Sequence, residues 1–254
     1  FGWEKLKLIM AKRLIECVPN FSEGRDMAVI KEIAAVIENV EGVKLLNIDP
    51  GAATNRTVIT FIGEPEAVCE AAFRAVKKAS EVIDMRKHTG EHPRIGATDV
   101  LPLVPVAGIT MEERVGEELS IPVYCYEEAA QVPERRNLAV CRAGEYEGLA
   151  KKMADPEWRP DFGPSVYDER VARTGASVIG ARDFLIAVNF NLNTTSTRRA
   201  NAIAFDVREK GRPKREGNKI TGKPLKDENG DTIMIPGTLK GTKAIGWFIE
   251  EYGI

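Results

Sequence analysis

The stretch Val43-Lys-Leu-Leu-Asn-Ile-Asp-Pro-Gly-Ala-Ala-Thr-Asn-Arg-Thr-Val-Ile-Thr-Phe-Ile-Gly63 decides the fold of the first part of the chain. Its apolar and β-branched residues predict two consecutive strands, at positions 43–48 and 57–62. Asp49-Pro50-Gly51 is a turn signal that closes the first of them. The elements on either side of this pair then determine how the sheet is built.

Amphipathic helices are predicted before and after the two strands. The first begins after Asp26 and ends at Gly42, and its apolar residues have the spacing of a one-faced helix: Ile30, Ile33, Ala34, Ile37 and Val40. The second begins at Pro65, a favourable residue for the first helical position. Its buried stripe consists of Val68, Ala72, Val76, Ala79 and Ile83.

Two further strands complete the first part of the fold. Residues 14–18 form a short apolar strand, and residues 100–106 form another, whose prolines predict an edge position. The order β-α-β-β-α-β predicts an α+β fold, the two-layer ferredoxin-like sandwich, with an antiparallel sheet and helices on one face. Extra elements follow: a helix that Thr110 and Glu113 open as a capping box, a strand at 121–126 and a helical stretch at 145–153.

A second, incomplete α/β subdomain is predicted over residues 182–254. The boundary is placed near Ala181, because a new series of elements begins just after it: a strand at 184–192, a helix at 197–208, a hairpin turn at 227–231 and a last strand at 246–252. Residues 10–181 form the first subdomain. Since Met10 resembles a natural start, residues 1–9 are expected to be a leader or tag.

The composition is typical of a soluble globular protein. Hydrophobic residues make up 43% and charged residues 29% of the 254 residues, and the net charge of -2 gives no general attraction to nucleic acid or anionic membranes. No apolar run approaches the ~20 residues that a membrane span needs. The four cysteines lack CxxC spacing, which favours reduced thiols and a cytoplasmic location. The basic run at 209–222 lacks interleaved aromatic residues, so it favours a solvated loop over an RNA site.

The segment His88-Thr-Gly-Glu-His-Pro-Arg-Ile-Gly-Ala-Thr-Asp99 holds both histidines of the chain. It has neither helical nor strand periodicity, so we expect a loop that carries function. Pro93 biases His92 toward an extended backbone. With an ordinary pKa of about 6.5, a histidine exchanges protons near neutrality. An acid–base role is the favoured interpretation, and a structural histidine held in a turn is the alternative.

A metal site is a further possibility at this loop. His88 and His92 would bind a metal ion, with Glu91 or Asp99 as third ligand, if both rings shared one face of a helix. The glycine and proline residues between and beside them disfavour that helix. We therefore expect no metal.

The turn after the first central strand supplies a second candidate. In one interpretation Asp49 is an ordinary turn residue. In a ferredoxin-like sheet, however, this turn and the histidine segment can lie close together, so that Asp49 orients a histidine for proton transfer. The sequence leaves both roles open.

Several short motifs together resemble the formiminotransferase family: Cys17-Val-Pro-Asn-Phe-Ser-Glu-Gly24, Thr54-Asn-Arg-Thr57, Gly90-Glu-His-Pro-Arg94, Ala143-Gly-Glu-Tyr-Glu147, Pro160-Asp-Phe-Gly-Pro164 and Gly180-Ala-Arg182. The resemblance runs from about residue 14 to residue 252. It implies a transferase that moves a formimino group from N-formimino-L-glutamate to N5 of tetrahydrofolate, in histidine degradation and one-carbon metabolism. It also implies that the folate lies between two similar α/β subdomains.

The resemblance implies roles for single residues as well. His92, in the Gly-Glu-His-Pro-Arg motif, is the expected catalytic histidine, and Asp49 is its expected partner. A stretch that begins at residue 162 and runs to about residue 172 resembles the folate-contacting segment. The expected folate ligands are Phe162, Gly163, Pro164, Ser165 and Gly175. Arg94 and Arg56 are expected either to pair with substrate carboxylates or to be structural surface arginines.

Alternatives from other classes are a related one-carbon transferase with a formyl donor, a non-catalytic folate- or metabolite-binding module, and an RNA-binding domain. The family resemblance implies a homodimer. Because the second subdomain stops before its second helix, a complex with a chain that supplies the missing part is also expected. Such a partner would cover apolar surface at residues 184–192 and 247–249. Neither a nucleic acid nor a membrane is expected as a partner.

Overall fold

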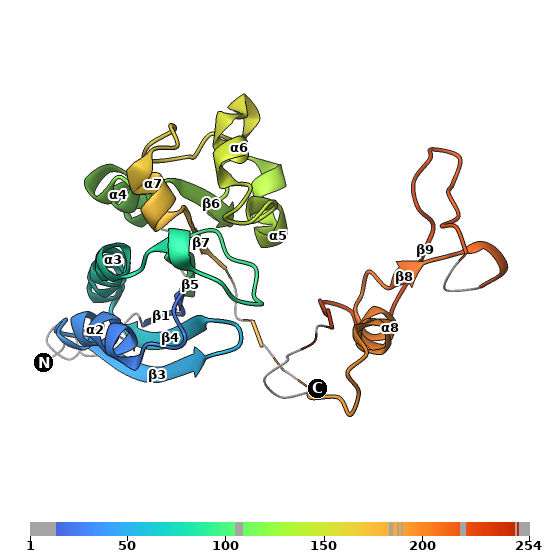
Figure 1. Cartoon of the computed structure of the whole chain (residues 1–254), viewed down its shortest axis with the longest axis horizontal. Helices are drawn as coiled ribbons and strands as arrows, with labels where there is room; N and C mark the ends of the chain where they lie inside the picture. Colours follow the sequence, from blue (N-terminus) through green and yellow to red (C-terminus); the bar gives the residue numbers. More distant parts are fainter. Residues whose placement is uncertain are drawn as a thin grey trace, which may run out of the picture. The chain divides into compact units, whose positions relative to one another are not determined.

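The computed structural model describes residues 14–104, 109–182, 185–186, 188, 190–218, 222–246 and 248. The chain forms two units, Phe1–Ile186 and Ala187–Ile254 (Figure 1). The predicted leader at residues 1–9 lies outside the described residues. The predicted boundary near Ala181 lies at the end of strand β7 (Ser177–Ala181), whereas the two units divide after Ile186, so the predicted subdomain bounds stay a prediction.

The first unit contains the predicted β-α-β-β-α-β order. Two short strands share its first position, and the remaining elements follow singly: β1 (Ile15–Cys17), β2 (Asn20–Phe21), α2 (Met27–Glu38), β3 (Val43–Gly51), β4 (Arg56–Gly63), α3 (Pro65–Val82) and β5 (Thr98–Val104). The hairpin of β3 and β4 therefore forms where its turn residues predict it. Both strands extend further toward the turn than the sequence pattern indicates.

The seven-stranded sheet has the order β3-β4-β1/β2-β5-β7-β6. Its first strands pair antiparallel, whereas β7 and β6 (Val123–Glu127) run parallel to β5. The fold is α+β, as predicted. The prediction of an antiparallel sheet is wrong, because β7 and β6 add parallel pairs and make the sheet mixed. The predicted edge position of β5 is wrong, because β7 pairs with the side that the prolines were expected to leave free. Pro102 still takes part through its carbonyl, which accepts from the amide of Val18 at 3.2 Å.

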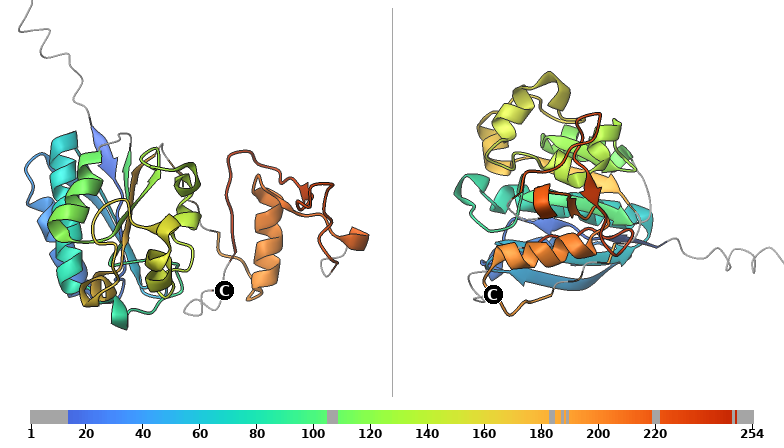
Figure 2. Two further views of the ribbon diagram at one scale, coloured as in Figure 1. Left: turned by 90° about the horizontal axis from the view of Figure 1, so that it is seen from above. Right: turned by 90° about the vertical axis from the view of Figure 1, so that its right-hand side faces the viewer.

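Helices cover both faces of the parallel half of the sheet (Figure 2). On one face, α2, α3 and α4 (Ile109–Leu119) pack around the larger core, which includes Leu101 and Ile179. On the other face, Val100 and Val178 pack with residues of three short helices, α5 (Leu138–Cys141), α6 (Leu149–Ala154) and α7 (Glu169–Thr174). The prediction of helices on one face only is wrong here, because helices of four to six residues are too short to show a periodic pattern.

The antiparallel half of the sheet keeps one face that the described helices leave open. Along β4, Ile59 and Phe61 are buried in the larger core, while Arg56 and Val58 alternate with them and are half-buried. A strand turns successive side chains to opposite faces. Arg56 therefore lies on the open face.

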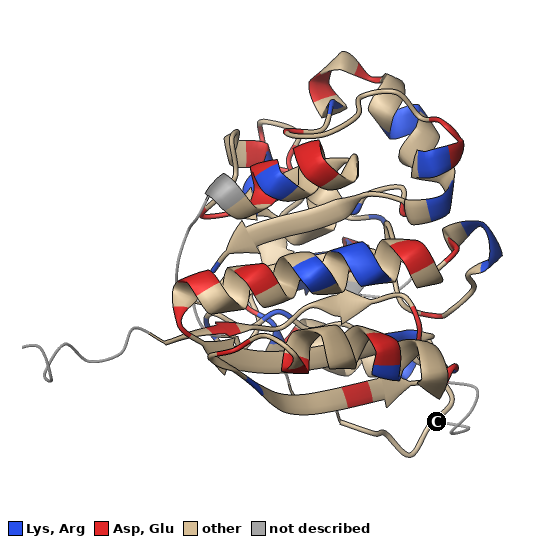
Figure 3. Cartoon of the chain, turned by 90° about the vertical axis from the view of Figure 1, so that its left-hand side faces the viewer, with Lys and Arg blue, Asp and Glu red and all other residues tan. Residues whose placement is uncertain are grey.

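Charges of both signs are interspersed over α2, α3 and α4 (Figure 3). Arg74 pairs with Glu70 and Arg114 with Glu118, both at i, i+4 spacing. This helical surface therefore carries no field of a single sign. Among the helices of the described residues, none combines the length and the apolar character that crossing a membrane requires.

The second unit contains a helix and a small hairpin. Helix α8 (Thr197–Val207) forms where a helix is predicted, and β8 (Arg212–Pro213) pairs antiparallel with β9 (Met234–Ile235). The predicted turn at 227–231 is present, with the amide of Asp227 donating to the carbonyl of Asp231 at 2.8 Å.

The strands predicted at 184–192 and 246–252 fall partly outside the described residues. Those of their residues that the structure describes form no strand, since an apolar run needs a pairing partner to become one. Four 3-10 helices complete the elements of the described chain: η1 (Met85–Lys87), η2 (Pro133–Arg136), η3 (Pro156–Trp158) and η4 (Glu216–Asn218).

Candidate active site

The histidine loop, residues 88–97, lies between η1 and β5 and contacts the turn between β3 and β4. Asn55 joins the two, because its Nδ2 donates to the carbonyl of Thr89 at 2.8 Å and its own carbonyl accepts from Nε2 of His88 at 2.8 Å. Gly90 fits so closely that a Cβ there would lie 2.4 Å from the carbonyl oxygen of Thr54. The expected proximity of turn and loop is confirmed. Residues 88–95 form neither helix nor strand, as predicted. The predicted loop extended to Asp99, but Thr98 and Asp99 belong to β5.

The other end of the loop is fixed by backbone contacts. Oγ of Ser22 donates to the carbonyl of Gly96 at 2.7 Å, and Gly96 forms a bridge with Gly175. Gly175 has a φ of +66°, in the left-handed region that favours glycine, and a Cβ there would lie 2.3 Å from the carbonyl oxygen of Ile95. The predicted folate ligand Gly175 therefore packs directly against the histidine loop.

His92 is half-buried, and its ring lies between a backbone carbonyl and a guanidinium. Nδ1 is 2.7 Å from the carbonyl oxygen of Pro93, so it carries the proton and donates, because a carbonyl only accepts. Nη1 of Arg56 lies 2.8 Å from Nδ1 and also contacts Nε2, the remaining acceptor of the ring. Burial, and then the positive charge of Arg56, lower the pKa of His92 to about 4. The ring is therefore neutral at neutral pH.

Arg56 has no acidic partner within ion-pair distance among the described residues, and its side-chain hydrogen bond there goes to Nε2 of His92. Burial lowers the pKa of Arg56 to about 10, while Asp99 opposes the shift and Arg142 adds to it. A half-buried guanidinium normally pairs with a carboxylate or phosphate. Its environment is therefore compatible with the predicted role of Arg56 in binding a substrate carboxylate.

Asp99 and Arg142 form a buried ion pair beside this cluster. Asp99 is fully buried and accepts from Nη2 and Nε of Arg142 at 2.6 and 3.2 Å, and from the amide of Ile95 at 3.1 Å. The pairing of β5 with β2 skips Asp99, and such a bulge redirects a side chain. Burial raises the pKa of Asp99, and the charge of Arg142 opposes that shift.

Arg142 is a site residue that sequence reasoning missed. It follows α5 and lies 43 positions from Asp99, so no local pattern connects the two. The signal that would have found it is its place directly before the motif Ala143-Gly-Glu-Tyr-Glu147.

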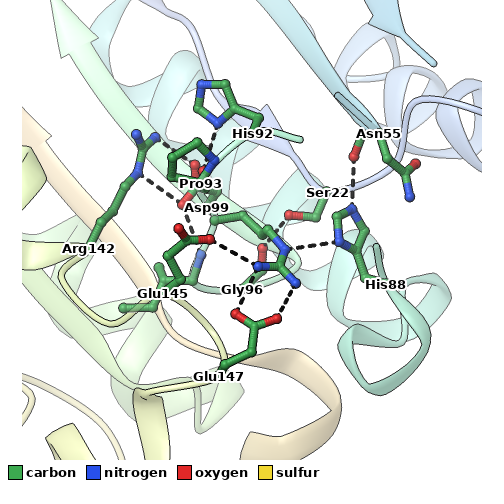
Figure 4. A network of polar contacts seen from close by, with 12 residues as sticks. Ser22, Asn55, His88, His92, Pro93, Gly96, Asp99, Arg142, Glu145 and Glu147 are labelled. Carbon is green, nitrogen blue, oxygen red and sulfur yellow. Dashed lines mark hydrogen bonds and ion pairs between the residues drawn. The ribbon is translucent and has the colours of Figure 1, made fainter. Parts of the chain in front are cut away.

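Arg94 is the centre of a second polar network, and its partners are Glu145, Glu147 and His88. Figure 4 labels these three partners. Nη1 donates to Glu145 at 3.1 Å and to Glu147 at 2.9 Å, Nη2 donates to Glu147 at 2.5 Å, and Nε donates to Nδ1 of His88 at 3.2 Å. The residue is 7% exposed. Because these groups use most of its donors, the contacts favour the structural alternative for Arg94 over the predicted substrate role.

His88 uses both ring nitrogens within the protein. Nε2 donates to Asn55, so Nδ1 is the acceptor for Arg94, and burial lowers the pKa of the ring. This is the arrangement of a structural histidine. A cavity of about 530 Å³ opens beside it, and its lining consists of His88, Thr89, Gly90, Arg94, Gly144, Glu145 and Glu147.

Asp49 forms neither a hydrogen bond nor an ion pair with His92 among the described residues. It pairs with Val58 across the hairpin, so its exposed side chain shares the open face of the sheet with Arg56. No hydrogen bond or ion pair in the described part of the chain joins Asp49 to the ring. The orienting role of Asp49 stays a prediction.

The other predicted folate ligands, Phe162, Gly163, Pro164 and Ser165, lie beside α4 and β6. The carbonyl of Phe162 accepts from the amide of Val123 at 3.0 Å, and its side chain packs against the larger core. Within the described chain, no hydrogen bond connects these four residues to the histidine loop. Their folate role stays a prediction.

No group of three or more His, Cys, Asp or Glu side chains is arranged to hold a metal ion in the portion of the chain that the structure describes. The ring nitrogens of both histidines instead face groups of the protein itself: Arg56 and Pro93 for His92, Asn55 and Arg94 for His88.

Two family models match the chain. The formiminotransferase domain, N-terminal subdomain, matches residues 14–182, and the formiminotransferase domain matches residues 187–254. The chain is 48% identical over 249 residues to the formimidoyltransferase-cyclodeaminase of Rattus norvegicus, which covers 94% of this chain and 42% of that protein. It is 48% identical over 209 residues to the glutamate formimidoyltransferase of Thermoplasma acidophilum, with 78% and 68% covered. The glutamate formimidoyltransferase of Streptococcus pyogenes serotype M1 is 45% identical over 213 residues, with 80% and 70% covered.

The chain thus spans 42% of the length of the rat cyclodeaminase relative and 68% of the Thermoplasma relative. The first family model alone covers more than half of the chain and includes the β3–β4 turn, the histidine loop, Asp99 and Arg142. The chain belongs to the formiminotransferase family.

Proposed function

We propose that this chain transfers a formimino group from N-formimino-L-glutamate to N5 of tetrahydrofolate. The observation that carries the proposal is the contact of His92, a neutral ring with one basic nitrogen, with Arg56, a guanidinium that has no acidic partner among the described residues. A base beside an anion-binding group suits a donor that carries two carboxylates. The names of the relatives, glutamate formimidoyltransferase and formimidoyltransferase-cyclodeaminase, support the same reaction.

In this reaction, His92 moves one proton in each direction. N5 of tetrahydrofolate attacks the carbon of the protonated formimino group. The N5–C bond forms as the C=N double bond opens, Nε2 of His92 accepts the proton that N5 loses, and the double bond re-forms when glutamate leaves. The ring then returns a proton to the glutamate nitrogen as the bond between this nitrogen and the carbon breaks. L-glutamate leaves as an amine, and the formimino group remains on N5. Such acid–base catalysis contributes about 10²–10⁴-fold.

The finer structural predictions belong to this proposal. The antiparallel order β3-β4-β1/β2-β5 supports a ferredoxin-like sandwich, to which β7 and β6 add. The four cysteines are free thiols, which supports a reducing, cytoplasmic location. Tetrahydrofolate is the acceptor substrate, and the acid–base chemistry assigned to His92 uses no metal.

Incubation of the purified chain with N-formimino-L-glutamate and tetrahydrofolate tests the proposal. We expect L-glutamate and formiminotetrahydrofolate to appear in equal amounts, both measured by mass spectrometry. A parallel reaction with N-formyl-L-glutamate tests the formyl alternative. A folded protein that binds tetrahydrofolate but transfers nothing from either donor would be a binding module, and the proposal would be wrong.

A further inference from the structure

Arg56 contacts the ring nitrogen through which His92 would accept a proton. Because Nδ1 donates to the carbonyl of Pro93, Nε2 is the ring atom that can take a proton, and Nη1 of Arg56 contacts it. If Nε2 were protonated, its N–H would face the N–H groups of the guanidinium. The positive charge of the imidazolium would also repel that of Arg56. In this arrangement the ring is a weak base.

The carboxylate that would neutralise Arg56 is already bound elsewhere. Asp99 accepts two hydrogen bonds from Arg142 and one from the amide of Ile95. The cluster thus contains two guanidinium groups and one buried carboxylate, and the carboxylate pairs with Arg142. The positive charge of Arg56 is left without an ion-pair partner among the described residues.

The charged groups around His92 come from several elements. Arg56 belongs to β4, Asp99 to β5, and Arg142 follows α5, while the exposed Asp49 of β3 lies on the same face of the sheet as Arg56. The two arginines disfavour a charged imidazole, and the aspartate nearest to them is engaged by Arg142. A second anion placed on Arg56 would change this balance.

We propose that Arg56 binds a carboxylate of the glutamyl donor and that this binding frees Nε2 of His92 for proton transfer. The inference rests on the proposed function. It adds that the donor binds to Arg56 first and that His92 becomes able to accept a proton only afterwards. A carboxylate presents two oxygens to the fork of a guanidinium, whereas an imidazole presents a single nitrogen, so the donor is the better partner.

Base strength then depends on the ligand. In the free protein, burial and Arg56 hold the pKa of His92 at about 4. A bound carboxylate neutralises Arg56 and removes the contribution of its charge, so the pKa of His92 rises, while burial still holds it below its ordinary value of about 6.5. Since a general base works best when its pKa is near the operating pH, the ring becomes effective when the donor is in place.

The sequence contains only two histidines, so NMR of the imidazole Cε1–H signals follows His92 directly. The variant His88→Gln assigns the two signals. We expect the pKa of His92 to be below 5 in the free protein. Saturation with N-formimino-L-glutamate in the absence of tetrahydrofolate should raise it by one unit or more, whereas sodium chloride at the same ionic strength should not.

The variant Arg56→Gln tests the coupling itself. The pKa of His92 in the free variant should rise by one unit or more, and the donor should no longer change it. The KM for the donor should rise at least tenfold, as expected for the loss of a charged hydrogen-bond partner. Arg25→Gln is the matched control, because Arg25 donates to the carbonyl of Ala52 in the same turn and makes no contact with His92. Arg25→Gln should leave the pKa of His92 and the KM for the donor unchanged.

The outcomes separate this inference from the proposed function. A pKa of His92 that does not move with saturating donor, in a protein that transfers the formimino group, overturns the coupling and leaves the function standing. A pKa that moves in a protein without transferase activity overturns the function and leaves carboxylate binding by Arg56 standing. If Arg56→Gln fails to fold, the titration of the unaltered protein decides by itself.

Discussion

Arg94 donates to both carboxylate oxygens of Glu147, at 2.9 and 2.5 Å, across 53 positions of the sequence. The same guanidinium donates to His88 and Glu145. One side chain thus connects the histidine loop to the segment that follows Arg142. The relative position of these two parts of the candidate site depends on Arg94, a residue that the contacts indicate is structural.

Arg94→Gln is expected to lower the free energy of unfolding by about 2 kcal/mol, because it removes a nearly buried guanidinium that donates to His88, Glu145 and Glu147. Urea unfolding measures this change. Arg74→Gln, which removes an exposed pair with Glu70, is the control and should change stability little. A raised KM for the donor with unchanged stability would instead return Arg94 to the substrate role.

His92→Gln is expected to lower kcat by about 10²-fold or more while the affinity for tetrahydrofolate stays nearly constant, because the base is lost and the scaffold is kept. His88→Gln should cost stability, since it removes the link between Asn55 and Arg94, and should lower kcat less. Steady-state kinetics and urea unfolding of both variants provide the measurement. Equal losses of kcat would show that the acid–base role does not belong to His92 alone.

Arg142→Leu is expected to lower the free energy of unfolding by about 3 kcal/mol at neutral pH, because Asp99 then lies buried without its cationic partner. Burial already raises the pKa of Asp99, and loss of Arg142 raises it further. Asp99 therefore keeps its proton to a higher pH in the folded variant than in the unfolded chain. The loss of stability is small below about pH 4 and grows as the pH rises.

Urea unfolding of Arg142→Leu and of the unaltered protein at pH 5 and pH 8 measures this dependence. The difference in the free energy of unfolding between the two proteins should be larger at pH 8. Adding Asp99→Asn to the variant should restore part of the stability at pH 8. In the Asp99→Asn background, the loss of stability caused by Arg142→Leu should be the same at both pH values. The same deficit at both pH values in the single variant would contradict the assignment.

Glu112 of α4 is 1% exposed, and neither of its carboxylate oxygens has a hydrogen-bond partner among the described residues. Burial raises its pKa from 4.5 to about 7. Between these values the unfolded chain is ionised while the folded protein keeps its proton, so this group makes stability fall as the pH rises from about 4.5 to 7. Glu112→Gln should remove this fall and be more stable above pH 7, by at most about 3 kcal/mol.

Thermal unfolding of Glu112→Gln across this pH range is the measurement. Glu113→Gln, at the exposed neighbouring position of the same helix, is the control and should follow the unaltered protein. Parallel pH profiles for all three proteins would show that the carboxyl group of Glu112 finds a partner when it ionises.

The sequence predicts best what neighbouring residues determine. The apolar spacing of Ile30, Ile33 and Ile37 is sufficient to place α2, and all three are buried. The central position of β5 was not predictable in this way, because β7 joins it from a segment that begins at Ser177. Strand pairing of this kind depends on residues far apart in the chain, which no local period records.

In the candidate site, too, local sequence identifies the residues but not their long-range contacts. His92 and Arg56 are both recognisable as candidates, but their contact spans 36 positions and follows from the way the β3–β4 turn packs on the loop. The pair of Asp99 and Arg142 depends in addition on a bulge in β5, which a pattern of alternating residues does not reveal. Residue types therefore predict which chemistry is present, and tertiary packing determines which groups meet.

The histidine loop is held largely through its own main chain. The carbonyls of Thr89 and Gly96 accept hydrogen bonds, and the amides of Glu91 and Ala97 donate them. Several side chains of the loop are thus not needed to keep its shape. The exposed side chains at positions 89 and 91 can therefore be varied without removing the main-chain hydrogen bonds that hold the loop around His92.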